Sequence, residues 1–184
     1  MEKIFIFIIM LIFPQVNNGN EINRQNSDSI IVIFWKGEID RSVSCPCSQT
    51  FKNANAIKTD TTICLKSKYF DKIKNAIKSA DVIKNEGYCN SKLFVKIDSM
   101  KICLCDFNKA FNANNEQVSL DVSVIYLIKW KSGFYNYIKK EYLQYFDEIK
   151  VYGIPPDYIY MYTDEKKPFR YNPIMKVCLM KEDN

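Results

Sequence analysis

The chain has 184 residues, of which 47% are hydrophobic, and carries a formal net charge of +5 at pH 7, with seven cysteines and no histidine. Without histidine there is no Ser-His-Asp triad, no Cys-His nucleophile pair and no histidine-ligated catalytic zinc. Paired-carboxylate hydrolysis needs only Asp and Glu, but no spacing in the chain marks two of them as partners. We therefore expect a protein that is not an enzyme and that uses no cofactor and no metal of its own.

The first 19 residues have the layout of a secretory signal peptide. Lys3 precedes an unbroken apolar run over Ile4–Phe13, and Pro14 with small or polar residues follows it. A bilayer-spanning helix needs about 20 apolar residues, so this run is too short for a membrane anchor. We therefore expect residues 1–19 to be a signal peptide, the protein to be secreted and extracellular, and no transmembrane segment to be present.

The next segment, residues 20–44, is expected to be a loose N-terminal stretch ahead of a single cysteine-rich domain over residues 45–184. It begins with a polar, aperiodic run and contains one short apolar segment, Ile30–Trp35, which predicts a buried strand. Pro46 then fixes an extended backbone inside the first cysteine pair. The polar, Asn-rich stretch Phe51–Thr62 is typical of a loop.

Tyr69–Asn85 carries the clearest helical pattern in the chain. Phe70, Ile73 and Ile77 recur at spacings of three and four and form one narrow apolar stripe, and Gly87 supplies a stop. A basic amphipathic helix lying on a membrane is one interpretation. A surface helix that packs its stripe on the core is the favoured one, because the stripe is narrow.

Two segments in the middle of the chain predict strands. Tyr88–Cys105 is β-favouring, and Met100, Ile102 and Leu104 alternate with Lys101 and two cysteines. After a polar connector, Val118–Trp130 gives the strongest strand pattern, with apolar residues alternating with Ser119, Asp121 and Ser123.

The C-terminal part of the chain predicts one helix and two further strands. Tyr135–Lys150 has apolar and aromatic residues along one helical side, and Pro155-Pro156 breaks any helix after it. Asp157–Thr163 and Ile174–Met180 are strand candidates. The tyrosines of this region could form a carbohydrate-binding surface, but alternating tyrosines are more typical of a half-buried sheet face. The elements together predict a β-rich α+β domain with two flanking helices.

All seven cysteines follow the leader, and in a secreted chain they indicate a disulfide framework. The odd number leaves one thiol free or shared with a second chain. Members of a Cys-x-Cys pair point to the same side of an extended strand, so each pair is expected to bond outward to different partners. Zinc ligation is the alternative, but the Cys-x₂-Cys spacing of zinc modules is absent. The disulfide candidates are Cys45, Cys47, Cys64, Cys89, Cys103, Cys105 and Cys178.

The order of these features resembles the netrin-like domain of the tissue inhibitors of metalloproteinases. The matching pieces are Cys45-Pro46-Cys47, Tyr88–Lys92 at a strand start, a long segment that ends in Lys131-Ser132-Gly133, and Ile149–Tyr152 followed by a proline. The resemblance implies an OB-like five-stranded barrel with flanking helices. It also implies that Cys178 takes the place of the late cysteine that bonds to one of the first pair.

In that family the first cysteine is the mature N-terminus and chelates the zinc of the protease. By resemblance, Cys45, Pro46 and Cys47 would form the protease-binding ridge, with Pro46 pointing at the specificity pocket. In this chain about 25 residues separate the expected leader from Cys45, so its nitrogen would be an amide unless those residues are removed.

Two functional hypotheses follow from the sequence. The first is a secreted, non-enzymatic inhibitor of an extracellular zinc metalloprotease. The alternative is a secreted binding or effector protein that uses a lysine-rich face on acidic glycans, because a lysine excess favours anionic partners. In either case we expect an extracellular partner and no nucleic acid.

Overall fold

The computed structural model describes residues 29–36, 46–48, 62–84, 91–105, 108–161 and 174–183. The expected signal peptide lies outside these residues, as do Cys45 and Cys89. The described part is a mixed α+β structure, as the sequence predicted. Its strands are β1 (Ser29–Trp35), β2 (Thr62–Ser67), β3 (Val82–Lys84), β4 (Ser91–Ile97), β5 (Met100–Cys105), β6 (Ala110–Asn112), β7 (Gln117–Val118) and β8 (Ile174–Lys181). Its helices are α2 (Phe70–Lys78), α3 (Val122–Lys131), the 3₁₀ helix η1 (Phe134–Tyr137), α4 (Lys140–Leu143) and α5 (Asp147–Tyr152).

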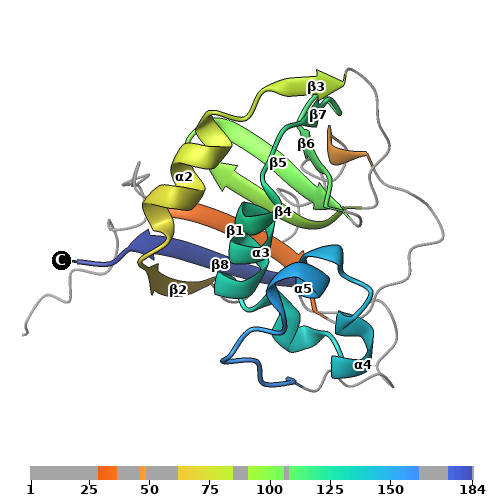
Figure 1. The fold of residues 1–184 in the computed structure, drawn as a ribbon. Coiled ribbons are helices and arrows are strands. Elements are labelled where there is room, and N and C mark those ends of the chain that lie inside the picture. The colour runs from red at the N-terminus through yellow and green to blue at the C-terminus, as the bar shows by residue number, and fades with distance from the viewer. Residues whose placement is uncertain are drawn as a thin grey trace, which may run out of the picture.

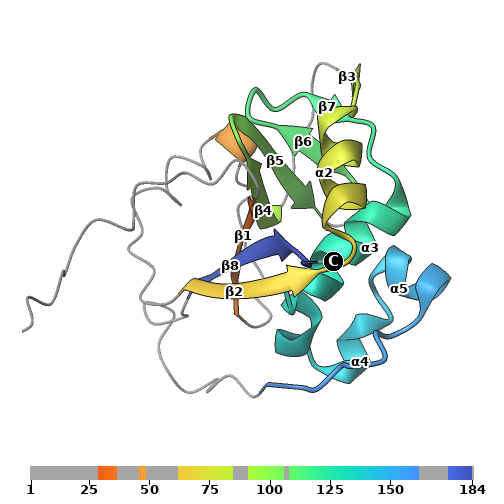
Figure 2. The same cartoon turned by 90° about the vertical axis from the view of Figure 1, so that its left-hand side faces the viewer.

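The eight strands form one sheet in the order β2-β8-β1-β4-β5-β6-β7-β3. The helices lie together on one side of this sheet (Figures 1 and 2). The sheet is open, with β2 and β3 at its edges, so the five-stranded OB-like barrel is not what the described strands form. A barrel closes by pairing its first and last strands, whereas here the two outermost strands each pair on one side only. No helix among the described residues has the length and apolar character needed to cross a membrane.

β1 and β8 confirm two of the predicted strands. In β1, Ile30, Val32 and Phe34 are fully buried and alternate with half-buried residues. β1 pairs antiparallel with both β4 and β8, with Val32 opposite Val95 and Val177. The sheet therefore includes residues that precede Cys45 in the chain.

The Tyr88–Cys105 segment, expected as one strand, contains the two strands of an antiparallel hairpin. Asp98 and Ser99 form the turn between β4 and β5, with Ile97 opposite Met100. Asp98 has a φ of 51°, a conformation that Asp tolerates better than most side chains. The turn contains no glycine to separate the two strands in the sequence, so the segment was predicted as one strand.

The prediction of a strand over Val118–Trp130 was wrong, because most of this segment is α3. Residues 124–129 are all buried in succession. A helix buried on every side carries no polar stripe, and a short apolar run of this kind cannot be assigned from its periodicity. The helix starts at Asp121, whose side chain accepts a hydrogen bond from the Ser123 amide at 2.7 Å.

The other helical predictions were partly right. α2 buries Phe70, Ile73 and Ile77 as expected, but it ends at Lys78 and the chain then enters β3. The expected helix over Tyr135–Lys150 is instead η1, α4 and α5, separated by extended backbone at Ile138 and Phe146. Residues 157–161 form no strand. The Tyr158 amide instead donates to the Pro155 carbonyl in a turn.

The sheet has a different apolar cluster on each face. The larger one joins α2, α3, η1 and α5 to the inward side chains of β1, β4, β5 and β8. The smaller one contains Cys47, Phe94, Cys103, Cys105 and Phe111, with Ile33 and Trp35 packed against it. Because successive side chains of a strand point to opposite faces, the cysteines of β5 lie on the face away from the helices.

We predict that the Asp121→Ala variant loses about 1 kcal/mol of the free energy of unfolding, because it removes the N-cap of α3. Hydrogen bonds from the Ser123 hydroxyl and amide lower the pKa of Asp121. The contribution is therefore present above the unfolded-state pKa of about 3.9 and shrinks as the pH falls through the lower folded-state value. Urea unfolding at several pH values measures it.

The Asp121→Asn variant is the matched control, since Asn also caps helices well, and it should keep most of the stability at neutral pH. An Asp121→Ala variant as stable as the unmodified protein would contradict the helix, since an exposed residue on a strand has no cap to lose.

Candidate ligand-binding surfaces

The ridge expected from the family resemblance is only partly described. Cys45 lies outside the described residues, and Pro46 is half-buried. Cys47 is buried and forms a disulfide with Cys103 of β5, with a Cα–Cα distance of 5.7 Å. Its Sγ also lies 3.4 Å from the Phe111 carbonyl oxygen, a contact rather than a hydrogen bond because a disulfide sulfur has no proton.

A pair of reciprocal hydrogen bonds holds the ridge to the turn between β6 and β7. The Ser48 amide donates to Asn115 Oδ1 at 3.1 Å, and Asn115 Nδ2 donates to Ser48 Oγ at 3.2 Å. Asn115 has a φ of 65°, a left-handed conformation that Asn tolerates better than most residues. Residues 46–48 are thus fixed to two neighbouring strands by covalent and polar links.

The disulfide agrees with outward bonding of the Cys-x-Cys pairs, because it joins one member of each pair. Cys105 is disulfide-bonded as well. The resemblance implied that Cys178 bonds to one of the first pair, and this was wrong. Cys47 bonds to Cys103 instead, and Cys178 and Cys64 are free thiols. Cys178 lies in β8, where its strand neighbours are β1 and β2, whereas Cys47 docks at β5.

No group of three or more metal-ligating side chains is found within the described ranges.

The most buried ionisable groups are Lys129, Glu148 and Tyr135, from α3, α5 and η1. Lys129 Nζ lies 2.5 Å from Glu148 Oε1, and both side chains are 1% exposed. The Tyr135 hydroxyl donates to the same oxygen at 2.9 Å, and burial together with Glu148 strongly raises the pKa of Tyr135. Phe134 and Phe146 lie beside the ammonium group.

This buried triad ties three helices together and has no access for a substrate. The role we assign to it is therefore structural, because an ion pair removed from water must be satisfied within the protein.

A surface with more potential for binding lies where α2, α3 and α5 meet. Four aromatic rings follow one another there, with centroid separations of 6.1 Å for Tyr69–Trp130, 5.7 Å for Trp130–Tyr126 and 5.2 Å for Tyr126–Tyr152. We call these four residues the aromatic strip. Tyr126 and Trp130 are one helical turn apart, so both lie on the same side of α3. Tyr152 is 46% exposed, Tyr69 and Trp130 are half-buried, and Tyr126 is buried.

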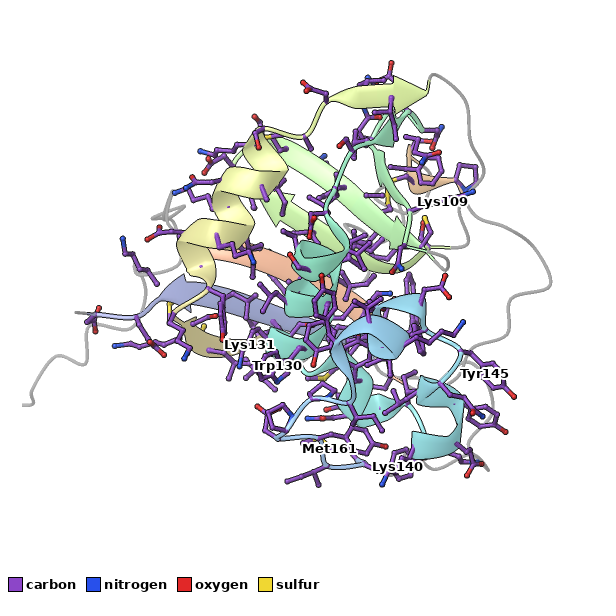
Figure 3. The ribbon with its side chains drawn as sticks, viewed as in Figure 1. Lys109, Trp130, Lys131, Lys140, Tyr145 and Met161 are labelled. Atoms are coloured by element: carbon purple, nitrogen blue, oxygen red, sulfur yellow. A yellow bond between two sulfur atoms is a disulfide. The ribbon has the colours of Figure 1, made fainter. Side chains whose placement is uncertain are left out.

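Two lysines lie against the aromatic strip. Lys131 Nζ is 3.5 Å from the centre of the Trp130 ring and 5.4 Å from that of Tyr69, and Lys68 Nζ is 5.4 Å from Tyr69. Such cation–π contacts place the charge at the ring face. Figure 3 shows Trp130 and Lys131 side by side, with Lys109 and Lys140 well away from them.

One carboxylate orients the strip. Trp130 Nε1 donates to Asp157 Oδ1 at 2.5 Å, which fixes the indole. Burial, with a smaller contribution from Asp157, raises the pKa of Tyr126. The strip therefore presents the rings of Tyr69, Trp130 and Tyr152, which can stack on flat apolar faces. The adjacent ammonium groups of the two lysines can pair with anions.

The sequence prediction placed Tyr126 and Trp130 on a strand, and it did not connect them with Tyr69. The i,i+4 spacing of these two aromatic residues was the available signal for a shared helix face. Of the C-terminal tyrosines considered as a carbohydrate surface, Tyr152 belongs to the strip. Tyr158 donates instead to the Ile138 carbonyl, and Tyr162, Phe169 and Tyr171 lie outside the described residues.

Comparison with protein-family models, with curated proteins and with solved structures finds no match to this chain. The functional argument therefore depends on the residues of these surfaces.

We predict that the Lys129→Met variant loses about 3–5 kcal/mol of the free energy of unfolding, because it leaves the Glu148 carboxylate buried without its counter-charge. The Lys129→Met/Glu148→Leu double variant removes both charges and should recover a large part of that loss. Guanidinium unfolding gives the free energy of unfolding of both variants, and the difference between them measures the coupling between Lys129 and Glu148. A double variant that is no more stable than Lys129→Met would contradict a coupled pair.

Proposed function

We propose that the chain is a secreted, non-enzymatic binding protein whose aromatic strip and flanking lysines contact acidic glycans. The observation that carries the proposal is the placement of the Lys68 and Lys131 ammonium groups on the rings of Tyr69 and Trp130. The leader-like first 19 residues and the disulfides support an extracellular site of action.

The charges of these two lysines remain available to an anion. Several other lysines form ion pairs, including Lys66 with Asp183, Lys78 with Asp98 and Lys181 with Asp71. Among the described residues, Lys68 and Lys131 contact rings and form no ion pair. A net charge of +5 adds a weak long-range attraction for anionic partners.

The chemistry of a sulfated or carboxylated sugar matches this surface. The apolar face of a sugar ring can pack on an aromatic ring, and its anionic substituents can pair with an adjacent ammonium group. The strip lies on helices whose buried side belongs to the main core, so its rings lose little freedom when a ligand binds.

We predict that the protein binds heparin, used as a sulfated glycan probe, and that the Lys68→Gln/Lys131→Gln double variant binds about tenfold more weakly. Two charge pairs of up to about 1 kcal/mol each are lost, and about 1.4 kcal/mol corresponds to tenfold. Calorimetry at two salt concentrations measures this, with a smaller salt dependence expected for the variant.

The Lys109→Gln/Lys140→Gln variant is the charge-matched control, because both lysines are exposed and lie away from the strip (Figure 3). It should bind almost as well as the unmodified protein. For the rings, Tyr152→Ala should weaken binding while Tyr145→Ala, whose ring is 70% exposed elsewhere, should not. Equal losses for the two lysine variants would contradict a defined site and leave only a general charge effect.

The second candidate is inhibition of a zinc metalloprotease by the Cys45–Cys47 ridge. The rigid attachment of residues 46–48 through the Cys47–Cys103 disulfide and the Ser48–Asn115 hydrogen bonds favours it, because an inhibitory ridge must hold its shape. Zinc chelation by the family's mechanism also requires a free N-terminus at Cys45, and β1, which lies between β8 and β4, must then stay in the sheet after the chain is cut.

We predict, for this second function, that the protein cut directly before Cys45, with β1 retained in the sheet, slows peptide hydrolysis by secreted zinc metalloproteases, and that Cys47→Ser/Cys103→Ser abolishes the effect. N-terminal sequencing of the secreted protein shows whether this start is used. A chain beginning near Asn20 with no effect on any protease would exclude the mechanism and leave glycan binding unaffected.

A further inference from the structure

Two free cysteines face each other at one edge of the sheet. β2 and β8 pair in parallel, and Cys64 lies directly opposite Cys178 in their register. Neither thiol is in a disulfide, although Cys47, Cys103 and Cys105 are disulfide-bonded. They come from distant parts of the chain and are brought together only by the strand pairing.

The spacing of the two cysteines is compatible with a covalent link. Neighbouring strands lie about 4.7–4.9 Å apart, and disulfides join Cα atoms about 4.4–6.8 Å apart. Residues directly opposite each other in a sheet project to the same face. The side chains of Val177 and Leu179, on either side of Cys178, belong to the core under the helices, so both thiols lie on the other face.

The two thiols differ in accessibility. Cys64 is exposed, whereas Cys178 is buried, with 9% of its surface accessible. Burial raises the pKa of Cys178, and the adjacent Cys64, through its charge and a hydrogen bond, raises it further. An external reagent therefore reaches Cys64 first, and Cys178 is placed to react with whatever forms on Cys64.

We propose that Cys64 and Cys178 form a reversible disulfide that fastens the edge strand β2 to β8, with a low-molecular-weight disulfide as the oxidant. The inference is independent of the proposed glycan binding.

The reaction is two successive thiol–disulfide exchanges. The Cys64 thiolate attacks one sulfur of the small disulfide, forms a mixed disulfide and releases the first small thiolate. The Cys178 thiolate then attacks Cys64 Sγ, forms the Cys64–Cys178 bond and releases the second small thiolate. The two protons of the cysteines go to the released thiolates. The protein loses two electrons, and the small disulfide gains them as it becomes two thiols.

The disulfide would act on β2, an edge strand with one neighbouring strand. β2 pairs only with β8 in the described sheet, and its side chains are exposed apart from Ser67. Edge strands open more readily than central ones because fewer hydrogen bonds and apolar contacts hold them. A covalent link at the middle of β2 would prevent this opening, and a reducing thiol would restore it.

The experiment is differential alkylation of the full secreted chain after equilibration with reduced and oxidised glutathione. Thiols are blocked at each redox ratio with one reagent, disulfides are reduced, and the new thiols are labelled with a second reagent before peptide mass spectrometry. We expect a peptide pair joined through Cys64 and Cys178, and a parallel loss of first-reagent label at both positions. Hydrogen exchange in β2 should be slower in the linked form.

Two variants test the order and the geometry of the reaction. Cys178→Ser should stop at the first step, so Cys64 carries glutathione under oxidising conditions. Cys64→Ser/Leu65→Cys moves the exposed thiol one residue along β2, where side chains point to the opposite face, and should give no link to Cys178. Leu65 is itself 37% exposed, so this control keeps an accessible thiol.

The proposal would be overturned if Cys64 and Cys178 stay fully alkylatable under oxidising conditions that modify Cys64 in Cys178→Ser. It would equally be overturned if Cys64 bonds to a cysteine other than Cys178, or if the shifted thiol at position 65 links as readily as the natural one.

Discussion

The packing of α3 against the sheet is the constraint on which the rest of the described structure depends. Its consecutive buried residues, 124–129, leave no solvent-facing side at the middle of the helix, so the charge of Lys129 must be satisfied inside the protein. Lys129 meets this requirement through Glu148, which also accepts a hydrogen bond from Tyr135. The ion pair and the hydrogen bond from Tyr135 therefore fix α5 and η1 to α3.

The two faces of the sheet are stabilised in different ways. Helices cover one face and supply the large apolar core. On the other face a small cluster forms around Cys47, Cys103 and Cys105, which are all disulfide-bonded. The strict alternation of β5 produces this division, because Ile102 and Leu104 face the helices while Cys103 and Cys105 face away. This face buries few apolar residues, so disulfides supply stability that apolar burial does not.

The parts of the fold that the sequence predicted are those with a clear polar alternation or stripe. β1, β8 and the start of α2 bury one side, and their patterns show it. α3 was missed because a helix buried all round has no stripe, and the β4–β5 hairpin was read as one strand because Asp98 makes the turn without glycine. The two candidate surfaces differ in the same way. The ridge is local in sequence and could be named from Cys-x-Cys, whereas the aromatic strip combines residues 69, 126, 130 and 152 and depends on the helix that was missed.

The two candidate surfaces lie on opposite faces of the sheet, so each can act without the other. The ridge at Cys47 belongs to the disulfide face, and the aromatic strip belongs to the helical face. β2 connects the free thiols to the strip, because it ends at Ser67 and Lys68 and Tyr69 follow directly. Ser67 Oγ accepts a hydrogen bond from the Tyr69 amide at 3.2 Å, which sets where Tyr69 leaves the strand. Tyr126 is held by the core of α3, and Tyr69 lies between β2 and α2, where its carbonyl accepts a hydrogen bond from the Ile73 amide at 3.0 Å. The position of Tyr69, and with it one end of the strip, therefore depends on two attachments, the edge strand β2 and the helix α2 that packs on the core.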